Sequence, residues 1–303
     1  MFNNTVRDAG LARANGTTVL DTSTSRNVLD VILLFDVSVS EDERAAGPDS
    51  PRRIDLLSDA ARTIVETIAK EDDVNEQVRI CLMTFSETIK VYVNGKPVTV
   101  DDATYEEFLK AYRNDPGANH GKMRATAQTY FCRPRDVVLP VFATEGGTDL
   151  NRAEQFALAV ESVHVNGDYE LNQEHYQSIV AIVSDFEAIV TPEVAKDAAK
   201  RDDGQLVIWG FSTIPVNPKD PNFRRPWPYW CPQEAIPNPD RFLAVKTSND
   251  LEDGYQQFAN LAACAIRVRT QTSPGEKPVV EPEMDPLQDP DNKLIVPKLD
   301  SFF

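Results

Sequence analysis

The chain contains few of the residues on which zinc and redox sites depend. Its 303 residues include three histidines and four cysteines, and no two cysteines form a C-x-x-C pair. The histidines show no spacing typical of metal ligands or of catalytic sites. The sequence therefore gives no indication of a zinc site or a dithiol redox site, and it leaves open a single disulfide between Cys132 and Cys231.

Positive charge is scarce as well. The chain has 31 lysines and arginines against 48 aspartates and glutamates, which gives a formal net charge of -17. An acidic surface repels nucleic acid and anionic membranes. We therefore expect neither of them as a partner.

Long apolar runs are also absent. No stretch approaches the roughly 20 apolar residues of a membrane-spanning helix. The chain begins Met1-Phe2-Asn3-Asn4-Thr5, without the basic and apolar regions of a secretion signal. These features predict a cytoplasmic protein.

Short apolar runs alternate with amphipathic helical patterns along the middle of the chain. The run from Val28 to Phe35 is almost continuously apolar, as in a central parallel strand covered on both faces. Strands are predicted at residues 28–35, 78–85, 88–93, 179–183, 206–211 and 241–246. The alternation predicts an α/β fold with a doubly wound, mostly parallel six-stranded sheet and helices on both faces.

One edge strand of this sheet is expected to be antiparallel. The predicted strands at residues 78–85 and 88–93 are joined by just two residues, Ser86 and Glu87. This connection is too short for a parallel crossover. Asn94-Gly95 and Pro97 predict a turn after the second run. The strand at residues 88–93 is therefore the predicted antiparallel edge.

The chain divides into a central domain and two appendages. Residues 1–26 are polar and without periodicity, which predicts an N-terminal arm. Residues 27–270 form the predicted domain, with insertions at about 114–145 and 213–240. Residues 271–303 are an acidic, proline-rich C-terminal tail.

A motif of one acid and two hydroxyls follows the first apolar run. In Asp36-Val37-Ser38-Val39-Ser40 the polar residues occupy every second position. Alternate side chains of an extended segment point the same way, so Asp36, Ser38 and Ser40 can share one face. Oxygen ligands of this kind suit Mg²⁺ or Mn²⁺ better than zinc.

Two further segments complete a recognisable set. Gly146-Gly147-Thr148-Asp149-Leu150 opens a helical pattern, and Val183-Ser184-Asp185-Phe186-Glu187 ends an apolar run. Together with the first motif they resemble the metal-ion-dependent adhesion site of the von Willebrand factor A (VWA) family. The sequence departs from the family at Phe186, where many relatives have glycine, so a stiffer or bulkier loop is expected there.

The resemblance implies a metal site and a way of using it. Ser38, Ser40 and Thr148 would bind the metal through their hydroxyls, and Asp36 and Asp185 would bind it directly or through water. The implied cation is Mg²⁺, with Mn²⁺ or Ca²⁺ as alternatives. An open position on the ion would be filled by an Asp or Glu of another protein. The implied function is a non-enzymatic, metal-dependent protein-interaction module, either an intracellular adaptor or an assembly component.

Two other functions stay open. A structural subunit of an assembly could use the metal only to join three loops. A Mg²⁺-dependent phosphate-ester hydrolase could use Glu145 and Glu187, which neighbour the predicted ligands, as bases. Aromatic and basic residues often anchor interfaces, and the predicted partner contacts of this kind are Arg225, Trp227, Tyr229, Trp230, Phe302 and Phe303.

Overall fold

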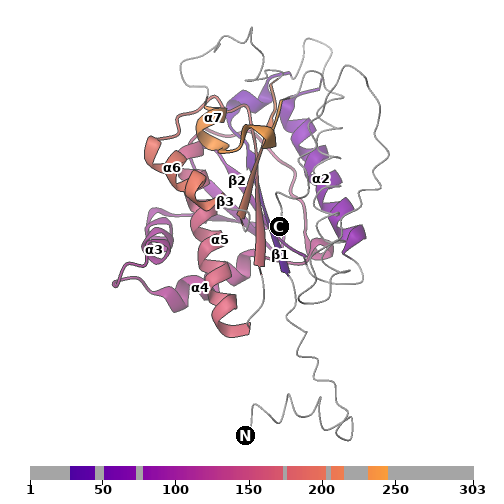
Figure 1. Cartoon of the computed structure of the whole chain (residues 1–303). Helices are drawn as coiled ribbons and strands as arrows, with labels where there is room; N and C mark the ends of the chain where they lie inside the picture. Colours follow the sequence, from indigo (N-terminus) through magenta and orange to yellow (C-terminus); the bar gives the residue numbers. More distant parts are fainter. Residues whose placement is uncertain are drawn as a thin grey trace, which may run out of the picture.

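A single mixed β-sheet lies at the centre of the molecule (Figure 1). The structure is a computed structural model that describes residues 28–44, 51–72, 78–172, 176–202, 206–214 and 231–244. The strands are β1 (Val28–Asp36), β2 (Val78–Phe85), β3 (Ile89–Val93), β4 (Lys96–Val100), β5 (Tyr176–Ser184), β6 (Leu206–Ser212) and β7 (Phe242–Ala244). Their order across the sheet is β4-β3-β2-β1-β5-β6-β7.

The pairing of the strands confirms the predicted fold class. β1 lies between β2 and β5 and is parallel to both, and β6 and β7 continue the parallel arrangement. β3 is antiparallel to β2. The chain thus winds outward from β1 in both directions, as a doubly wound sheet does.

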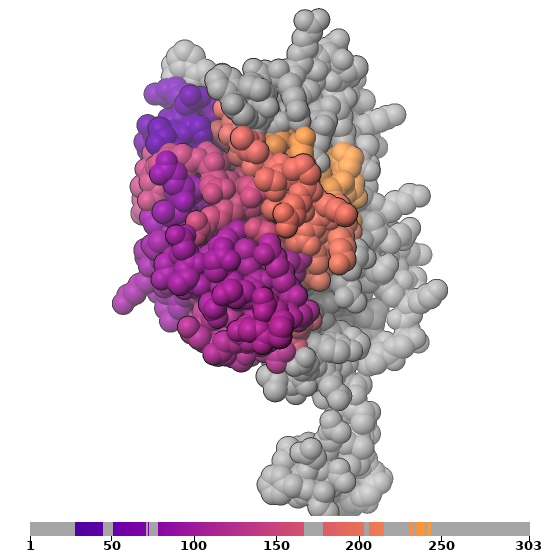
Figure 2. Space-filling view, turned by 90° about the vertical axis from the view of Figure 1, so that its left-hand side faces the viewer, coloured from indigo at the N-terminus to yellow at the C-terminus, as the bar shows by residue number. Residues whose placement is uncertain are grey.

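Helices cover both faces of this sheet (Figure 1). The helix α2 (Arg53–Glu71) packs on one face, and most of the others pack on the opposite face. Figure 2 looks onto that second face, where α3 and α4, in magenta, lie below α6, in salmon. These helices are α3 (Asp102–Tyr112), α4 (His120–Tyr130), α5 (Leu150–Asn172), α6 (Pro192–Arg201) and the short α7 (Pro232–Ala235).

The continuous apolar run of β1 follows from its central position. Successive side chains of a strand point to opposite faces, and both faces of β1 are covered. The set on the α2 face is Leu29, Val31, Leu33 and Phe35, and the set on the α5 face includes Ile32 and Leu34. Because every residue of β1 is buried, neither face requires the polar half of an alternating pattern.

The sheet has seven strands where six were predicted, and β4 is its edge. The turn predicted at residues 94–97 is a tight hairpin, with Asn94 and Gly95 at φ 50° and 74°. Tyr92 pairs with Pro97 directly beyond it. Proline is tolerated on an edge strand because one side of that strand makes no ladder hydrogen bonds. The antiparallel β3 is therefore one position in from the edge.

The stretch at about 114–145, predicted from the sequence as an insertion, contains α4 and a short 3-10 helix, η2 (Pro134–Asp136). Met123, Ala127 and Tyr130 of α4 are buried in the core shared with α3 and α5. The segment then crosses to the other face, where Phe142 packs on Phe35 with ring centroids 5.3 Å apart. The insertion is thus an integral part of both cores.

Several predictions fall outside the described residues. These are the arm at 1–26, the tail at 271–303 and all six predicted partner contacts, Arg225, Trp227, Tyr229, Trp230, Phe302 and Phe303. Cys132 and Cys231 lie inside the described part and are free thiols, so the disulfide left open by the sequence does not form. None of the described helices combines the length and apolar character needed to cross a membrane.

Candidate metal centre

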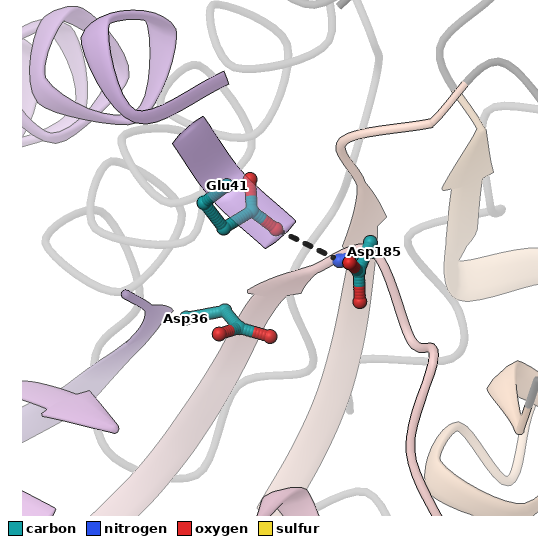
Figure 3. Close-up of side chains that lie close together, drawn as sticks. All are labelled: Asp36, Glu41 and Asp185. Atoms are coloured by element: carbon teal, nitrogen blue, oxygen red, sulfur yellow. Dashed lines mark hydrogen bonds between the residues drawn. The ribbon is translucent and has the colours of Figure 1, made fainter. Parts of the chain in front are cut away.

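The residues of the three motifs meet where the central strands end. Asp36 is the last residue of β1, and Asp185 directly follows β5, its parallel neighbour. The carboxyl ends of adjacent parallel strands meet at one edge of a sheet, where α/β proteins bind ligands. Asp36, Asp185 and a third acid, Glu41, each place a carboxylate oxygen so that all three oxygens lie within 4.8 Å of one another (Figure 3).

The loop after β1 turns the two serines of the first motif toward each other. The backbone N–H of Ser38 donates to Asp36 Oδ1 at 2.8 Å. The hydroxyl oxygens of Ser38 and Ser40 lie 2.9 Å apart, whereas the side chain of Val39 between them is exposed. The two hydroxyls therefore lie together as predicted, but Ser40 belongs to the 3-10 helix η1 (Val39–Asp42) and not to an extended segment.

The second motif lies directly alongside this loop. Val39 N–H donates to the carbonyl of Gly146 at 3.1 Å, and Glu145 N–H donates to the carbonyl of Val37 at 2.7 Å. Gly146 has φ +58°, a conformation that other residues rarely adopt. Thr148 follows this turn and is half-buried. The turn thus brings Thr148 to the predicted metal edge.

Asp149 fixes the start of α5 beside that edge. Its Oδ1 accepts a hydrogen bond from Arg152 N–H at 3.0 Å, which is the interaction of a helix N-cap. Its own N–H donates to the carbonyl of Ser86, at the end of β2, at 2.9 Å. The Thr148 loop is therefore anchored at both of its ends.

The third motif connects its own loop to the first. Ser184 donates its hydroxyl to Asp36 Oδ2 at 2.6 Å and accepts from Phe186 N–H at 2.9 Å. Asp185 Oδ1 accepts from Glu187 N–H at 2.9 Å. Phe186 has φ 57° and a fully buried side chain, whose ring packs on Phe242 at 5.3 Å between centroids. The bulk expected at Phe186 is thus accommodated in the core.

Glu41 is the member of the cluster that the sequence analysis did not find. It belongs to η1 (Val39–Asp42) and is fully buried. Its Oε1 accepts from the backbone N–H of Asp185 at 3.1 Å, drawn dashed in Figure 3, and from the Thr213 hydroxyl at 2.9 Å. The one feature of the sequence that could have indicated Glu41 as part of the site is its position directly after Ser40.

Burial makes the negative charges of this cluster unfavourable. Desolvation raises the pKa of Asp36 to about 7, with a further contribution from the charge of Asp185. Desolvation likewise raises the pKa of Glu41 well above its usual value, followed by the charges of Asp36 and Asp185. Arg53 supplies a positive charge, with Nη1 3.7 Å from Asp185 Oδ2. Three carboxylates so close together fit a divalent cation, which favours their charged forms.

The donor set also fits a hard cation. It offers carboxylates and hydroxyls, without the sulfur or imidazole that zinc favours. Glu41 Oε2 is buried and has no hydrogen-bond partner within the described residues. A buried carboxylate oxygen without a partner is unfavourable, and a cation bound to the carboxylate would offset part of that cost.

Metal-free protein is expected to lose stability relative to Asp36→Asn as the pH rises from about 4 to about 7. The folded-state pKa of Asp36 is raised from 3.8 to about 7, so between these values the folded chain holds a proton that the unfolded chain has released. Stability contributed by this group therefore falls with rising pH, by on the order of 4 kcal/mol at full titration. Urea unfolding of both proteins in EDTA at several pH values measures this difference, and a difference that is constant with pH would contradict it.

The two glutamates considered as hydrolytic bases lie outside the carboxylate cluster. Both oxygens of Glu145 bind the Lys90 ammonium, one of them at 2.7 Å. Glu187 is exposed, and partial burial followed by the charge of Asp185 raises its pKa. Neither residue belongs to the group of buried acids that the described chain brings together.

No protein-family model matches the chain, and no curated protein does. Solved structures do match. They include the PilB minor pilin from Streptococcus sanguinis, with 9% identity over 81% of this chain and 64% of that chain at a TM-score of 0.46. A von Willebrand factor type A protein from Catenulispora acidiphila matches with 12% identity over 78% of this chain and 43% of that chain at a TM-score of 0.43.

A third match is proximal thread matrix protein 1 from the mussel byssus, solved with zinc in its metal-ion-dependent adhesion site (MIDAS) motif. It has 12% identity over 84% of this chain and 52% of that chain, at a TM-score of 0.38. The chain thus spans less than two thirds of each of these three structures. All three TM-scores are below 0.5.

The fold itself is the doubly wound α/β arrangement that the sequence predicts. A central parallel sheet is covered by helices on both faces, and three loops at one edge carry the residues named in the sequence analysis. Of these residues, Asp36 and Asp185 share one carboxylate cluster and Ser38 and Ser40 are paired. Thr148 lies in the loop bonded to them.

Proposed function

We propose that the chain is a non-enzymatic interaction module that binds a divalent cation, Mg²⁺ in the cell, and through it a carboxylate of another protein. The observation that supports this most is the approach of three buried carboxylates to within 4.8 Å at the sheet edge where the motif hydroxyls also lie. In the cell such a module would act as a cytoplasmic adaptor or assembly component.

The predicted ligands would have two roles at this site. Ser38, Ser40 and Thr148 would bind the cation through neutral hydroxyls, and Asp36 and Asp185 would bind it directly or through water. The cation, when bound, supplies positive charge that attracts a partner's acid. Ser38 N–H and Ser184 fix the two oxygens of Asp36, so the carboxylate is oriented before the ion arrives.

The surroundings of the site favour a partner whose acid is flanked by basic residues. Asp42 and Glu43 are exposed but paired with Arg52 and Arg53, whereas Glu187 is exposed two residues after Asp185, and the whole chain carries a net charge of -17. Such a surface repels an acidic partner and attracts a basic one. The cation would bind the partner's acid, and the net negative charge of the chain would favour basic residues beside that acid. Arg225, Trp227, Tyr229, Trp230, Phe302 and Phe303 remain predicted contacts for the same partner.

Thr148→Ala is expected to abolish recovery of the partner from cell extract in Mg²⁺. Removal of the hydroxyl takes away one predicted ligand at a half-buried position, so the fold should be retained. An affinity pull-down compares the wild-type chain in Mg²⁺, the wild-type chain in EDTA and the variant. Thr126→Ala is the matched control, because Thr126 is half-buried, as Thr148 is, and lies on α4, remote in sequence from all three motifs.

A partner recovered by wild type and Thr126→Ala in Mg²⁺, and lost in the other two conditions, supports the proposal. Equal recovery in all four conditions contradicts it. That second result would move binding to the predicted aromatic contacts or the tail, and the chain would then fit a structural subunit better than a metal-dependent adaptor.

A further inference from the structure

Glu41 has the position and burial of a metal ligand, although it lies outside the set implied by the family resemblance. Its side chain is fully buried, and its carboxylate end points toward Asp185 (Figure 3). One oxygen is fixed by two donors, Asp185 N–H at 3.1 Å and the Thr213 hydroxyl at 2.9 Å. The other oxygen, Oε2, has no hydrogen-bond partner in the described part of the chain.

The hydrogen bonds of Glu41 resemble the support that proteins give to ligating carboxylates. Donors around a ligand fix its orientation and leave a lone pair for the ion. Thr213 follows β6 and Asp185 follows β5, so two neighbouring strand ends hold the Glu41 carboxylate in place. A carboxylate needed only for packing would gain nothing from an unpaired buried oxygen.

The charges at the site change when Glu41 is counted. Asp36 and Asp185 alone neutralise a divalent cation, and Arg53, 3.7 Å from Asp185, is itself paired with Glu43 at 3.2 Å. Glu41 therefore adds one negative charge beyond those that the cation needs. Because cation affinity at oxygen sites rises with the number of charged ligands, such a site holds its ion without a partner's acid.

We propose that Glu41 is a direct ligand of the cation. It takes a coordination position that water would otherwise fill, leaves the position for the partner's acid open, and makes the ion a resident part of the free chain. This rests on the proposed function, because it concerns the same cation. It adds a third carboxylate to the ligand set and predicts tighter, partner-independent metal binding.

The test is titration of the metal-free full chain with Mn²⁺ alone, followed by calorimetry, for the wild type, Glu41→Gln and Asp42→Asn. Glutamine has nearly the same shape, and its amide oxygen can still accept from Asp185 and Thr213. Asp42 is the adjacent acid, exposed and paired with Arg52 at 2.8 Å, so Asp42→Asn removes the same charge from the same turn. We expect at least a tenfold loss of Mn²⁺ affinity for Glu41→Gln and none for Asp42→Asn.

A second readout separates a ligand from a merely nearby charge. Bound Mn²⁺ speeds the relaxation of the protons of water molecules that it coordinates. If Glu41 holds one position, its loss admits water, so relaxation per bound ion should be higher in Glu41→Gln than in the wild type. Equal relaxation, or equal Mn²⁺ affinity, would overturn the assignment of Glu41 as a ligand.

Folding of the variant is checked in EDTA. Glu41→Gln removes one of three clustered negative charges, so its melting temperature in EDTA should equal or exceed that of the wild type, whereas Mn²⁺ should stabilise it less. A variant that melts lower in EDTA and gains as much from Mn²⁺ as the wild type would give Glu41 a structural role and overturn the inference. If the wild type itself binds no Mn²⁺, the proposed function fails; if the wild type binds Mn²⁺ and only the Glu41→Gln results deviate, only the inference fails.

Discussion

Asp36→Asn is expected to reduce the affinity for Mg²⁺ and Mn²⁺ by about 100-fold or more, because cation affinity at oxygen sites depends on the number of charged ligands. The local structure should survive the change. The asparagine oxygen can accept from Ser38 N–H, and its amide can donate to the Ser184 hydroxyl, in the places where Asp36 now bonds both groups. Calorimetric titration of the full chain measures the effect.

Asp115→Asn is the matched control for that experiment. Asp115 accepts a hydrogen bond from the N–H two residues further on, at 2.8 Å, as Asp36 does, but it is exposed. Its substitution should leave cation affinity unchanged. If Asp36→Asn binds Mn²⁺ as tightly as the control variant, Asp36 is not part of the metal site and the account of the three loops fails.

Phe186→Gly is expected to destabilise the chain by about 1–4 kcal/mol, although it relieves backbone strain. The left-handed conformation of Phe186 costs roughly 1–2 kcal/mol that glycine would not incur. Loss of a fully buried phenylalanine that packs on Phe242 costs about 3–5 kcal/mol. The packing loss is the larger effect, so the net change is destabilising. Urea unfolding in EDTA measures the free energy without any contribution from metal.

The control for the strain is Asn114→Gly. Asn114 also has a positive φ, 54°, but its side chain is exposed. Its substitution should change stability by less than about 0.5 kcal/mol. An unfolding free energy of Phe186→Gly at or above that of the wild type would show that strain outweighs packing at this loop.

The fold class and the meeting of the motifs could be predicted because they depend on local pattern. A continuous apolar run specifies a central strand such as β1, and parallel neighbours bring their carboxyl ends, with Asp36 and Asp185, to one edge. The start of α6 is equally local, because Pro192 occupies its first position and the hydroxyl of Thr191 accepts from Val194 N–H at 3.4 Å. No tertiary information was needed for any of these.

The features that were missed depend on distant contacts. Glu41 is buried because it accepts from Thr213, 172 residues further along the chain, and no local pattern indicates that bond. The sequence predicted only a turn at Pro97, because proline usually ends a strand. In the structure Pro97 pairs with Tyr92 of β3 and belongs to the edge strand β4. The helix α4 carries few apolar residues, and its buried face becomes apparent only against α3 and α5.

The central claim is that the three loops at this sheet edge hold one divalent cation. The most direct measurement is a crystal structure of the full chain soaked in Mn²⁺, with anomalous scattering used to locate the ion. The account predicts one strong peak in contact with the carboxylate cluster of Asp36, Glu41 and Asp185 and within reach of the Ser38, Ser40 and Thr148 hydroxyls. A well-ordered site without a peak, or a peak only elsewhere on the acidic surface, would contradict it.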